Sequence, residues 1–589
     1  MTQFVSDLAI SLSSWQSFER MIGRLLTAEG FQYVALVGRS GDGGADVLAQ
    51  KRGRRWLFQV KRWTSPAGSE VLDRTVAAAR TYAADVPVIV SKSGFTQSAL
   101  RQRNRLAAEG INLQLWDRAS LLARAARLPS DPLSARDPDR FNPRPYQEDA
   151  ASAVLNAYRR DRSASALVVL ATGLGKTWVA AESMRRLRAL NGHLKVLVIA
   201  HSNDLVYQLE RSFWPFLTDD QLTAVVNGYE RPKWIDLNHY SLLFASRDSL
   251  APALESGVEL PLFDVVIVDE CHHLGSARYE EVLDALSAGR PGGPFLLGLT
   301  ATPWRPDGAS LDHRFDAPIV SRDLVDGLRS GFLANVDYRM FTDNVQWESL
   351  RELRGDRFSP KAINRTLFID EWDDAVIDRT REVWEELGVR RRGIVFCGTI
   401  DHAERVAARI NAVGFASARA IYSKATSGRE MSAIDRAKLL LDFADGRVEI
   451  LCSVDVLNEG VDVPDVNLIV FQRVTHSRRI FVQQLGRGLR VSPGKERVIV
   501  LDFVSDVRRF AAGLELKRSL DRSDDSHRTV RVSLPSRVTF QRANQEDVQG
   551  ASFLGQWLGD LQEVEDAGED VSILRYPPIG LLTSDARKR

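Results

Sequence analysis

Short apolar runs, separated by stretches of helical character, recur through most of this 589-residue chain and restrict it to an α/β fold. Between residues 141 and 322 the runs are SALVVLA, LKVLVIA, SLLFAS, FDVVIVDE and PFLLGLTA. Between residues 376 and 512 they are RGIVFCG, RAIYS, VEILCSVD, VNLIVFQRV and RVIVLDF. Short runs that are apolar on both faces are typical of parallel strands buried under helices. The pattern therefore predicts two consecutive parallel-sheet lobes, over 141–322 and 376–512.

The rest of the chain divides where its composition changes. Residues 1–127 indicate a separate mixed α/β domain with a helix that Ser14 would cap, and the proline-rich stretch that follows predicts a linker over 128–140. Because few contacts cross a linker of this kind, we expect the N-terminal domain to be separable. The polar residues 323–375 predict an irregular connecting segment, and residues 513–589 carry no recognisable motif.

The distribution of charge and the cysteine content indicate what the chain binds and in which compartment it works. The net charge is +1, but residues 1–130 hold 18 Lys and Arg against 10 Asp and Glu, which gives this end a charge of +8. Such a basic end is typical either of polyanion binding or of an ordinary solvated surface. The three cysteines lie far apart without metal-site spacing, and no apolar run approaches the ~18 residues of a membrane span. We therefore expect a cytoplasmic protein that does not engage a membrane.

The sequence LATGLGKT, residues 170–177, follows a predicted strand and opens a predicted helix. That context suits a phosphate-binding loop, because backbone N–H groups at a helix N-terminus bind phosphate oxygens. Gly173 and Gly175 would let the backbone approach the nucleotide. Lys176 is expected to contact the β- and γ-phosphates, and Thr177 is expected to bind Mg²⁺. One position departs from the strict pattern, which has glycine where this chain has Leu170.

A pair of acids ends the apolar strand FDVVIVDECHH later in the same lobe. Asp269 would give Mg²⁺ a second protein contact, and Glu270 would activate the water that attacks the γ-phosphate. The loop and this acidic strand end together predict that the lobe binds ATP with Mg²⁺ and hydrolyses it.

These motifs and their order resemble those of superfamily 2 helicases and translocases of the DExH type, most of all the type III restriction and RadD-like branch. The resemblance covers residue 141 to about residue 510. The matching segments are RPYQ (144–147), LATGLGKT, IAHSNDLVYQ (199–208), FASRDSL (244–250), VDECH, LTATP (299–303), VDVLNEGVDVP (454–464) and QQLGRGLR (483–490).

The resemblance implies two RecA-like lobes with ATP held between them. It implies that Arg144 and Gln147 recognise adenine. It also implies that Arg487 and Arg490 reach the γ-phosphate from the second lobe when the lobes close. The other positions expected at the nucleotide are Thr172 in the phosphate loop and Gly460 and Asp462 in the second lobe.

A hairpin near the N-terminus, GDGGADVLAQKRGRRWLFQVK over residues 41–61, carries a second set of chemical groups. Because alternate strand residues face the same side, Gln59 and Lys61 should point together, with Asp46 beside them on the partner strand. Metal-assisted phosphodiester cleavage needs such a set: Asp46 and Gln59 to bind the metal, and Lys61 to orient or activate water. Glu19, in the preceding helix, is a candidate fourth residue. Polar residues on an alternating hairpin also arise by chance.

This hairpin and its surroundings resemble the PD-(D/E)xK nuclease fold and, within it, the Mrr-like restriction endonucleases, in which glutamine replaces the usual acid. The resemblance covers about residues 14–125. It includes SFERMIGRLLTAEGF, the GDGGAD turn and VIVSKSGFTQSALRQRNRLAAEGINLQLWDRASL. It implies DNA cleavage with Mg²⁺, for which Mn²⁺ can substitute.

Together the two resemblances predict an α/β protein: a restriction-endonuclease-like domain, two tandem RecA-like lobes and a small C-terminal region. The expected function is an ATP-dependent DNA helicase or translocase with a metal-dependent endonuclease, in restriction or antiphage defence. Double-stranded DNA, with or without single-stranded regions, is the expected partner, and self-assembly or a partner subunit stays open. Two alternatives also stay open: a repair or remodelling motor whose first domain only binds DNA, and an ATP-switched sensor of duplex RNA.

Overall fold

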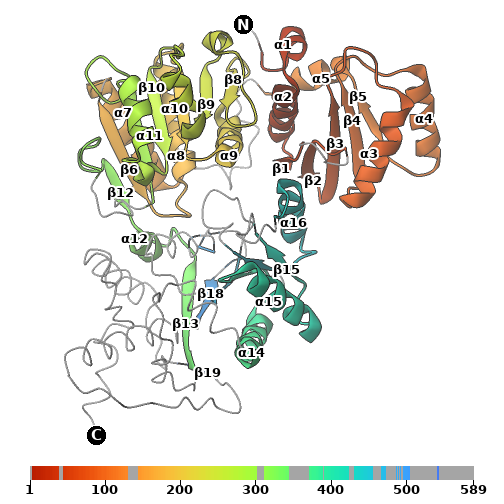
Figure 1. Cartoon of the computed structure of the whole chain (residues 1–589), viewed down its shortest axis with the longest axis vertical. Helices are drawn as coiled ribbons and strands as arrows, with labels where there is room; N and C mark the ends of the chain where they lie inside the picture. The colour runs from red at the N-terminus through yellow and green to blue at the C-terminus, as the bar shows by residue number, and fades with distance from the viewer. Residues whose placement is uncertain are drawn as a thin grey trace.

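The part of the chain that the structure describes contains three sheets, one in each of three α/β units (Figure 1). The computed structural model describes residues 3–38, 44–129, 143–162, 164–301, 311–343, 370–388, 391–422, 430–454, 466–472, 486, 488–489, 491, 495, 497–503 and 540–542. Within these ranges, no helix is both long and apolar enough to cross a membrane.

The N-terminal unit is a five-stranded mixed sheet in the order β1-β2-β3-β4-β5. The first three strands form an antiparallel meander, and β3, β4 and β5 run parallel. The strands are β1 (Gln32–Leu36), β2 (Val47–Lys51), β3 (Arg54–Lys61), β4 (Val86–Ser91) and β5 (Gln114–Trp116). The helices are α1 (Asp7–Leu12), α2 (Trp15–Ala28), α3 (Ser69–Thr81), α4 (Gln97–Ala108) and α5 (Arg118–Ala125).

Successive side chains of β3 point to opposite faces of this sheet, and the two faces pack against different helices. Phe58 and Val60 pack into the core under α1, α2 and α5, whereas Leu57 faces the α3 side. Gln59 and Lys61 therefore lie on the α3 face, as the two-residue period predicts. Ser14 caps α2 by accepting from the Ser17 N–H at 3.0 Å, as the sequence indicates.

The second unit is a sheet of seven parallel strands in the order β12-β6-β11-β10-β7-β9-β8. Helices α7, α8 and α9 bury one face of it, and α10 and α11 bury the other, so both faces are dry and the strands are continuously apolar. The strands are β6 (Ser165–Leu170), β7 (Val196–Ala200), β8 (Thr223–Val226), β9 (Leu242–Ser246), β10 (Val265–Asp269), β11 (Phe295–Thr300) and β12 (Val320–Arg322). The helices are α7 (Pro145–Arg160), α8 (Lys176–Leu190), α9 (Asn203–Phe213), α10 (Arg247–Glu255) and α11 (Ala277–Ala285).

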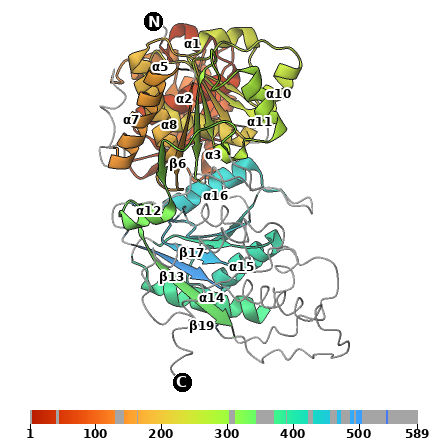
Figure 2. The same cartoon turned by 90° about the vertical axis from the view of Figure 1, so that its left-hand side faces the viewer.

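The third unit is also seven-stranded, in the order β15-β16-β14-β17-β18-β13-β19, with β19 alone antiparallel to its neighbour. Figure 2 shows α12 (Leu324–Arg329) where this lobe meets the first. The strands are β13 (Asn335–Asp343), β14 (Gly393–Phe396), β15 (Ala418–Ile421), β16 (Ile450–Ser453), β17 (Leu468–Phe471), β18 (Arg497–Asp502) and β19 (Phe540–Arg542). The helices are α14 (Asp370–Glu386), α15 (Ile400–Val413) and α16 (Ala433–Asp445).

Strand β13 corrects one prediction from the sequence. Residues 323–375 were expected to be an irregular connection, but β13 lies within them and pairs in parallel with β18, so it belongs to the second lobe. Its sequence, NVDYRMFTD, alternates between polar and apolar residues from Asn335 to Met340, a strand signal that the polar composition of the whole segment obscured. The C-terminal region contributes β19, which extends the same sheet edge.

The N-terminal domain is not loosely tethered, contrary to the expectation of few contacts. On its α2 side it packs against the first lobe, where Arg20 forms ion pairs with Glu210 at 2.6 Å and with Glu230 at 2.9 Å. All three side chains are buried. Arg24 donates to the carbonyls of Gln221 at 2.7 Å and Thr218 at 2.8 Å.

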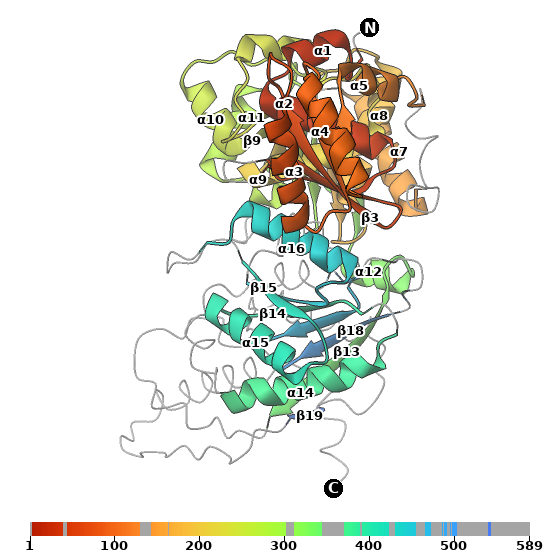
Figure 3. The ribbon, with the colours of Figure 1, turned by 90° about the vertical axis from the view of Figure 1, so that its right-hand side faces the viewer.

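The same domain also contacts the second lobe, through α16. Figure 3 shows α16 running across the lower end of the domain, beneath α3. Arg55, 1% exposed, pairs with Asp442 at 3.0 Å and with Asp445. Leu441 and Ala437 of α16 belong to an apolar cluster with residues of the N-terminal sheet and α3: Val37, Ala45, Leu48, Leu57, Ala78 and Tyr82. The first domain therefore bridges both lobes, and three of its arginines serve domain packing rather than an open basic face.

Candidate active sites

The hairpin brings Asp46 and Gln59 together at one end of the N-terminal sheet. Val47 pairs with Phe58, so Asp46 lies next to Gln59 across the ladder, and the Asp46 carboxylate accepts from the Val60 N–H at 2.6 Å. Both side chains are almost fully buried. A carboxylate fixed by a backbone donor keeps one orientation, which suits a ligand group.

Lys61 ends β3 on the face that carries Gln59. Its side chain is partly exposed, and its Nζ lies 5.8 Å from the centroid of the Trp63 ring. The side chains of Asp46 and Gln59 are buried, whereas that of Lys61 is more accessible. This arrangement fits a site that a substrate enters from solvent.

Glu19 approaches the same end of the sheet from α2. A Cβ atom built on Gly38 would lie 2.6 Å from the Glu19 Oε2, so only glycine leaves room for the carboxylate there. The Gly38 N–H donates to the backbone carbonyl of Asp46 at 3.1 Å. Gly38 thus joins the Glu19 carboxylate to the segment that carries Asp46, a link that the sequence alone did not reveal.

The donor set fits a divalent metal of the Mg²⁺ type. Among the described residues no group of three or more His, Cys, Asp or Glu side chains could hold a metal ion. Mg²⁺ prefers oxygen ligands, keeps several waters and is often held by only one or two carboxylates. Asp46 and the Gln59 amide oxygen would hold it, and when bound it would supply Lewis-acid activation of the phosphodiester.

The phosphate loop has the conformation that its glycines predict. Gly173 and Gly175 have φ angles of +93° and +86°, a left-handed region that side chains disfavour. A Cβ on Gly175 would also lie 2.5 Å from the Gln147 Nε2. Lys176 and Thr177 begin α8 directly after this turn, so the helix N-terminus faces the loop.

Lys176 and the acidic strand end are in contact. The Lys176 Nζ lies 3.0 Å from the Glu270 Oε1, and the His272 Nδ1 lies 3.3 Å from the Glu270 Oε2. His272 also reaches the Thr300 hydroxyl at 3.1 Å, which connects this centre to the LTATP segment. The lysine expected on the phosphates therefore pairs with the expected base, and a bound nucleotide would compete for it.

Burial and neighbouring charges shift the pKa values of Asp269 and Glu270 in opposite directions. Burial raises the pKa of Asp269, and the neighbouring Glu270 charge raises it further, to about 6. Burial acts on Glu270 in the same direction, but Lys176 and then His272 outweigh it and hold the pKa of Glu270 well below its usual range. A cation bound beside Asp269 would favour the charged form of this carboxyl group and so counteract its raised pKa.

The second lobe meets the phosphate loop at Gly486. A Cβ atom on Gly486 would lie 2.5 Å from the Thr172 Cβ, so the two backbones are in close contact. The buried Thr172 hydroxyl has no hydrogen-bond partner among the described residues, which fits a loop built for a phosphate ligand. Arg487, Arg490, Gly460 and Asp462 lie outside the described residues, and their roles stay predictions.

Gln147 is already engaged within the protein. Its Oε1 accepts from the Arg144 N–H at 3.0 Å, and its Nε2 donates to the Leu174 carbonyl at 2.9 Å. Arg144 donates to the Phe332 carbonyl at 2.6 Å. Both residues thus brace the phosphate loop and its surroundings, and adenine recognition by either stays a prediction that requires these bonds to exchange.

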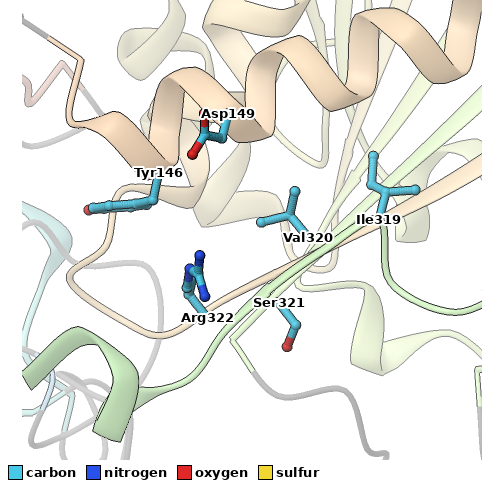
Figure 4. Close-up of a pocket in the computed structure, with 6 residues that line it drawn as sticks. All are labelled: Tyr146, Asp149, Ile319, Val320, Ser321 and Arg322. Carbon is cyan, nitrogen blue, oxygen red and sulfur yellow. The ribbon is translucent and has the colours of Figure 1, made fainter. Parts of the chain in front are cut away.

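A cavity opens beside the phosphate loop between α7 and β12 (Figure 4). Asp149 and Arg322 point toward it from opposite walls, and Tyr146 lies at its edge. The Tyr146 hydroxyl donates to the Leu174 carbonyl at 2.8 Å, and the Arg322 carbonyl accepts from the Ala171 N–H at 2.9 Å. Both walls are thereby tied to the loop, although no sequence motif singles out Asp149 or Arg322.

Three family models match consecutive parts of the chain. Residues 10–125 match a restriction endonuclease model, residues 140–305 match "Type III restriction enzyme, res subunit", and residues 378–492 match the helicase conserved C-terminal domain. The chain therefore combines a domain that matches a restriction endonuclease model with two segments that match type III restriction enzyme and helicase models. This organisation and its mixed α/β fold confirm the family and the fold class that the sequence motifs predict.

Individual relatives are distant. A putative mitochondrial ATP-dependent helicase, irc3, of Schizosaccharomyces pombe is 27% identical over 372 residues, which cover 62% of this chain and 58% of the relative. The EcoAI type I restriction enzyme endonuclease subunit of Escherichia coli is 28% identical over 394 residues, which cover 63% and 47%. The chain thus spans about half the length of these relatives.

Two solved structures align with most of the chain at low sequence identity. The type ISP restriction-modification enzyme LlaBIII bound to DNA aligns with 83% of this chain and 37% of its own, at 17% identity and a TM-score of 0.48. A putative HsdR subunit fragment of a type I restriction enzyme from Vibrio vulnificus aligns with 79% and 84%, at 20% identity and a TM-score of 0.46.

Proposed function

We propose that this protein is an ATP-dependent DNA helicase or translocase that also cuts DNA with a divalent metal, Mg²⁺ or Mn²⁺, in restriction or antiphage defence. One observation carries the proposal: a single chain holds both the Lys176–Glu270 centre and, in a domain docked onto the same motor, the Asp46–Gln59 hairpin. The similarity to restriction enzyme subunits supports the setting. A repair motor that lacks a nuclease would not need the second centre.

The residues have separate tasks in each centre. Lys176 and Thr177 would bind the nucleotide with its Mg²⁺, Asp269 would complete the metal contact, and Glu270 would take the proton of the attacking water. In the nuclease, Lys61 would orient or activate the water, with Glu19 as a further acid at its edge. ATP supplies the driving force for movement along DNA, and the metal supplies activation of the phosphodiester.

The first test compares nucleic acids and cofactors in the full-length protein. We expect double-stranded DNA to stimulate ATP hydrolysis more than duplex RNA does, and plasmid DNA to be cut only when Mg²⁺ or Mn²⁺ is present. Ca²⁺ should support binding without cutting, because it is larger and its coordination is looser. Stronger stimulation by RNA, without cleavage of any DNA, would favour the RNA-sensor alternative.

The docking contacts suggest how the motor would govern the nuclease. ATP-driven closure moves one lobe relative to the other, yet the N-terminal domain contacts both. Its contact with the first lobe is buried, through Arg20, Glu210 and Glu230. Its contact with the second lobe is more open, since Asp442 and Asp445 are 20% and 15% exposed. We infer that lobe movement acts on the nuclease through Arg55 and α16.

Removing the two acids should uncouple the activities. We expect the double variant Asp442→Asn and Asp445→Asn to lose most of the stimulation of DNA cutting by ATP, because each charge-assisted bond that fixes α16 to Arg55 is worth about 1.5–3 kcal/mol. ATP hydrolysis should change less than about 2-fold, since neither residue lies in the nucleotide centre. The measurement is the ratio of plasmid cutting with and without ATP.

A matched control removes one exposed acid of the same lobe. Asp378 pairs with Arg381 at 3.4 Å within α14, and this described ion pair involves neither neighbouring domain. Asp378→Asn should keep the wild-type ratio. An unchanged ratio in the double variant would show that α16 does not carry the coupling.

A further inference from the structure

The buried hydroxyl of Thr75 faces two oxygen atoms at once. Thr75 lies in the middle of α3, is completely buried and points at β3. Its Oγ1 is 2.8 Å from the Val71 carbonyl oxygen and also within hydrogen-bond distance of the Gln59 Oε1. A hydroxyl carries one hydrogen and can donate to only one of these acceptors.

The Val71 carbonyl is the preferred acceptor for the Thr75 hydrogen. A threonine within a helix commonly donates to the carbonyl four residues earlier, and Thr81 of the same helix does so to Ala77 at 3.2 Å. If Thr75 donates to Val71, two oxygens would face each other at Gln59 in a buried place, which is costly. The nitrogen and oxygen of an amide have nearly the same shape, so a half-turn of the Gln59 amide resolves the conflict.

After that half-turn the conflict at Thr75 is removed. The Gln59 NH₂ donates to the Thr75 oxygen, and the Thr75 hydroxyl donates to the Val71 carbonyl. The Gln59 carbonyl then takes the position directed at Gly44, in the turn that leads into Asp46. A Cβ atom on Gly44 would lie 2.8 Å from the Gln59 Nε2, the position that the oxygen takes after the half-turn. Gly44 also has a φ of +98°, which side chains disfavour. Glycine at position 44 therefore leaves room for the Gln59 amide group.

We propose that Thr75 is a positioning residue that directs the carbonyl oxygen of Gln59 toward the turn carrying Asp46. The inference rests on the proposed nuclease function and deepens it. A carboxylate at position 59 would need no such device, because its two oxygens are equivalent. An amide offers an oxygen in only one of two orientations. Thr75, whose hydrogen is used by Val71, offers only lone pairs and therefore selects the NH₂ group.

The test compares three variants of the full-length protein by Mn²⁺ binding, measured by electron paramagnetic resonance without nucleotide or DNA. Asp46→Asn supplies the background from other sites. Thr75→Val keeps the shape and removes the hydroxyl, and we expect it to weaken Asp46-dependent Mn²⁺ binding by roughly 10-fold or more, as for other residues that orient metal ligands. Thr75→Ser, which keeps the hydroxyl, should remain near wild type.

Thr81→Val is the matched control, because it removes the same kind of hydroxyl-to-carbonyl bond from the same helix without touching Gln59. It should bind Mn²⁺ as the wild type does. Among the three threonine variants, the Mg²⁺ concentration for half-maximal DNA cutting should rise in Thr75→Val alone, while ATP hydrolysis stays unchanged in all of them.

Three results would overturn the inference. Thr75→Val could bind Mn²⁺ like wild type, Thr75→Ser could lose binding as fully as Thr75→Val, or wild type could show no Asp46-dependent binding. Failure of the nuclease function would look different. Protein that binds Mn²⁺ through Asp46 and depends on the Thr75 hydroxyl, yet cuts no DNA, would support the role of Thr75 and contradict the proposed nuclease.

Discussion

Glu270→Gln is expected to hold ATP but to lower its hydrolysis by roughly 10²- to 10⁴-fold, the usual contribution of a general base. The amide has nearly the shape of the carboxylate but cannot take the proton of the attacking water. It also removes the charge that pairs with Lys176 at 3.0 Å, so the lysine is more available to the phosphates and binding should not weaken. DNA-stimulated ATP turnover and nucleotide affinity, measured on the same preparation, check both halves of this prediction.

Two further variants serve as a contrast and a control for Glu270→Gln. Lys176→Ala should instead weaken nucleotide binding, because it removes the phosphate contact. Glu259→Gln, an exposed glutamate of the same lobe, should hydrolyse ATP at the wild-type rate. A Glu270→Gln protein with wild-type turnover would show that the end of β10 is not the hydrolytic centre.

The second large effect is expected at the hairpin. Lys61→Ala should reduce DNA cutting by roughly 10²- to 10³-fold, the cost of removing one group that stabilises charge in a transition state. Hydrolysis of ATP should stay unchanged, because Lys61 contacts neither lobe among its described interactions. The measurement is the rate of plasmid nicking and linearisation at saturating Mg²⁺.

Arg62→Ala provides the matched control for charge near the hairpin. Arg62 follows Lys61 directly and is exposed, so its loss removes one cation from the same surface. A uniform loss of DNA affinity would affect both variants, whereas a catalytic role affects Lys61 alone. Equal loss of cutting in the two variants would favour the reading in which this domain only binds DNA.

The sequence was most informative where chemistry and local periodicity coincide. The β6 strand, the glycine loop and α8 occur where LATGLGKT indicates, because a buried strand followed by left-handed glycines and a helix leaves few alternatives. The two-residue period of β3 likewise predicts that Gln59 and Lys61 share a face. The boundaries of β4 match the apolar run VPVIVS.

The sequence was least informative where tertiary contacts decide the role of a residue. From the sequence, Arg20 and Arg55 belong to a basic, solvent-exposed end of the chain. In the structure both are buried at domain contacts, where they pair with acids on α9, on α16 and after β8. Helix α3 was not predicted at all, since its alanines and arginines give only a weak apolar face. Thr75 was therefore missed with it, although it touches the residue that the motif singled out.

In the function proposed above, one chain carries two separate catalytic centres, and the motor acts on the nuclease. The most direct test measures plasmid cutting and ATP hydrolysis in the same tubes for wild type, Lys61→Ala and Lys176→Ala. We expect Lys61→Ala to hydrolyse ATP normally and to cut DNA roughly 10²- to 10³-fold more slowly than the wild type. We expect Lys176→Ala to lose hydrolysis together with the ATP-stimulated part of cutting, and to keep cutting accessible DNA. Wild-type cutting by the Lys61→Ala protein would contradict the assignment of the nuclease centre.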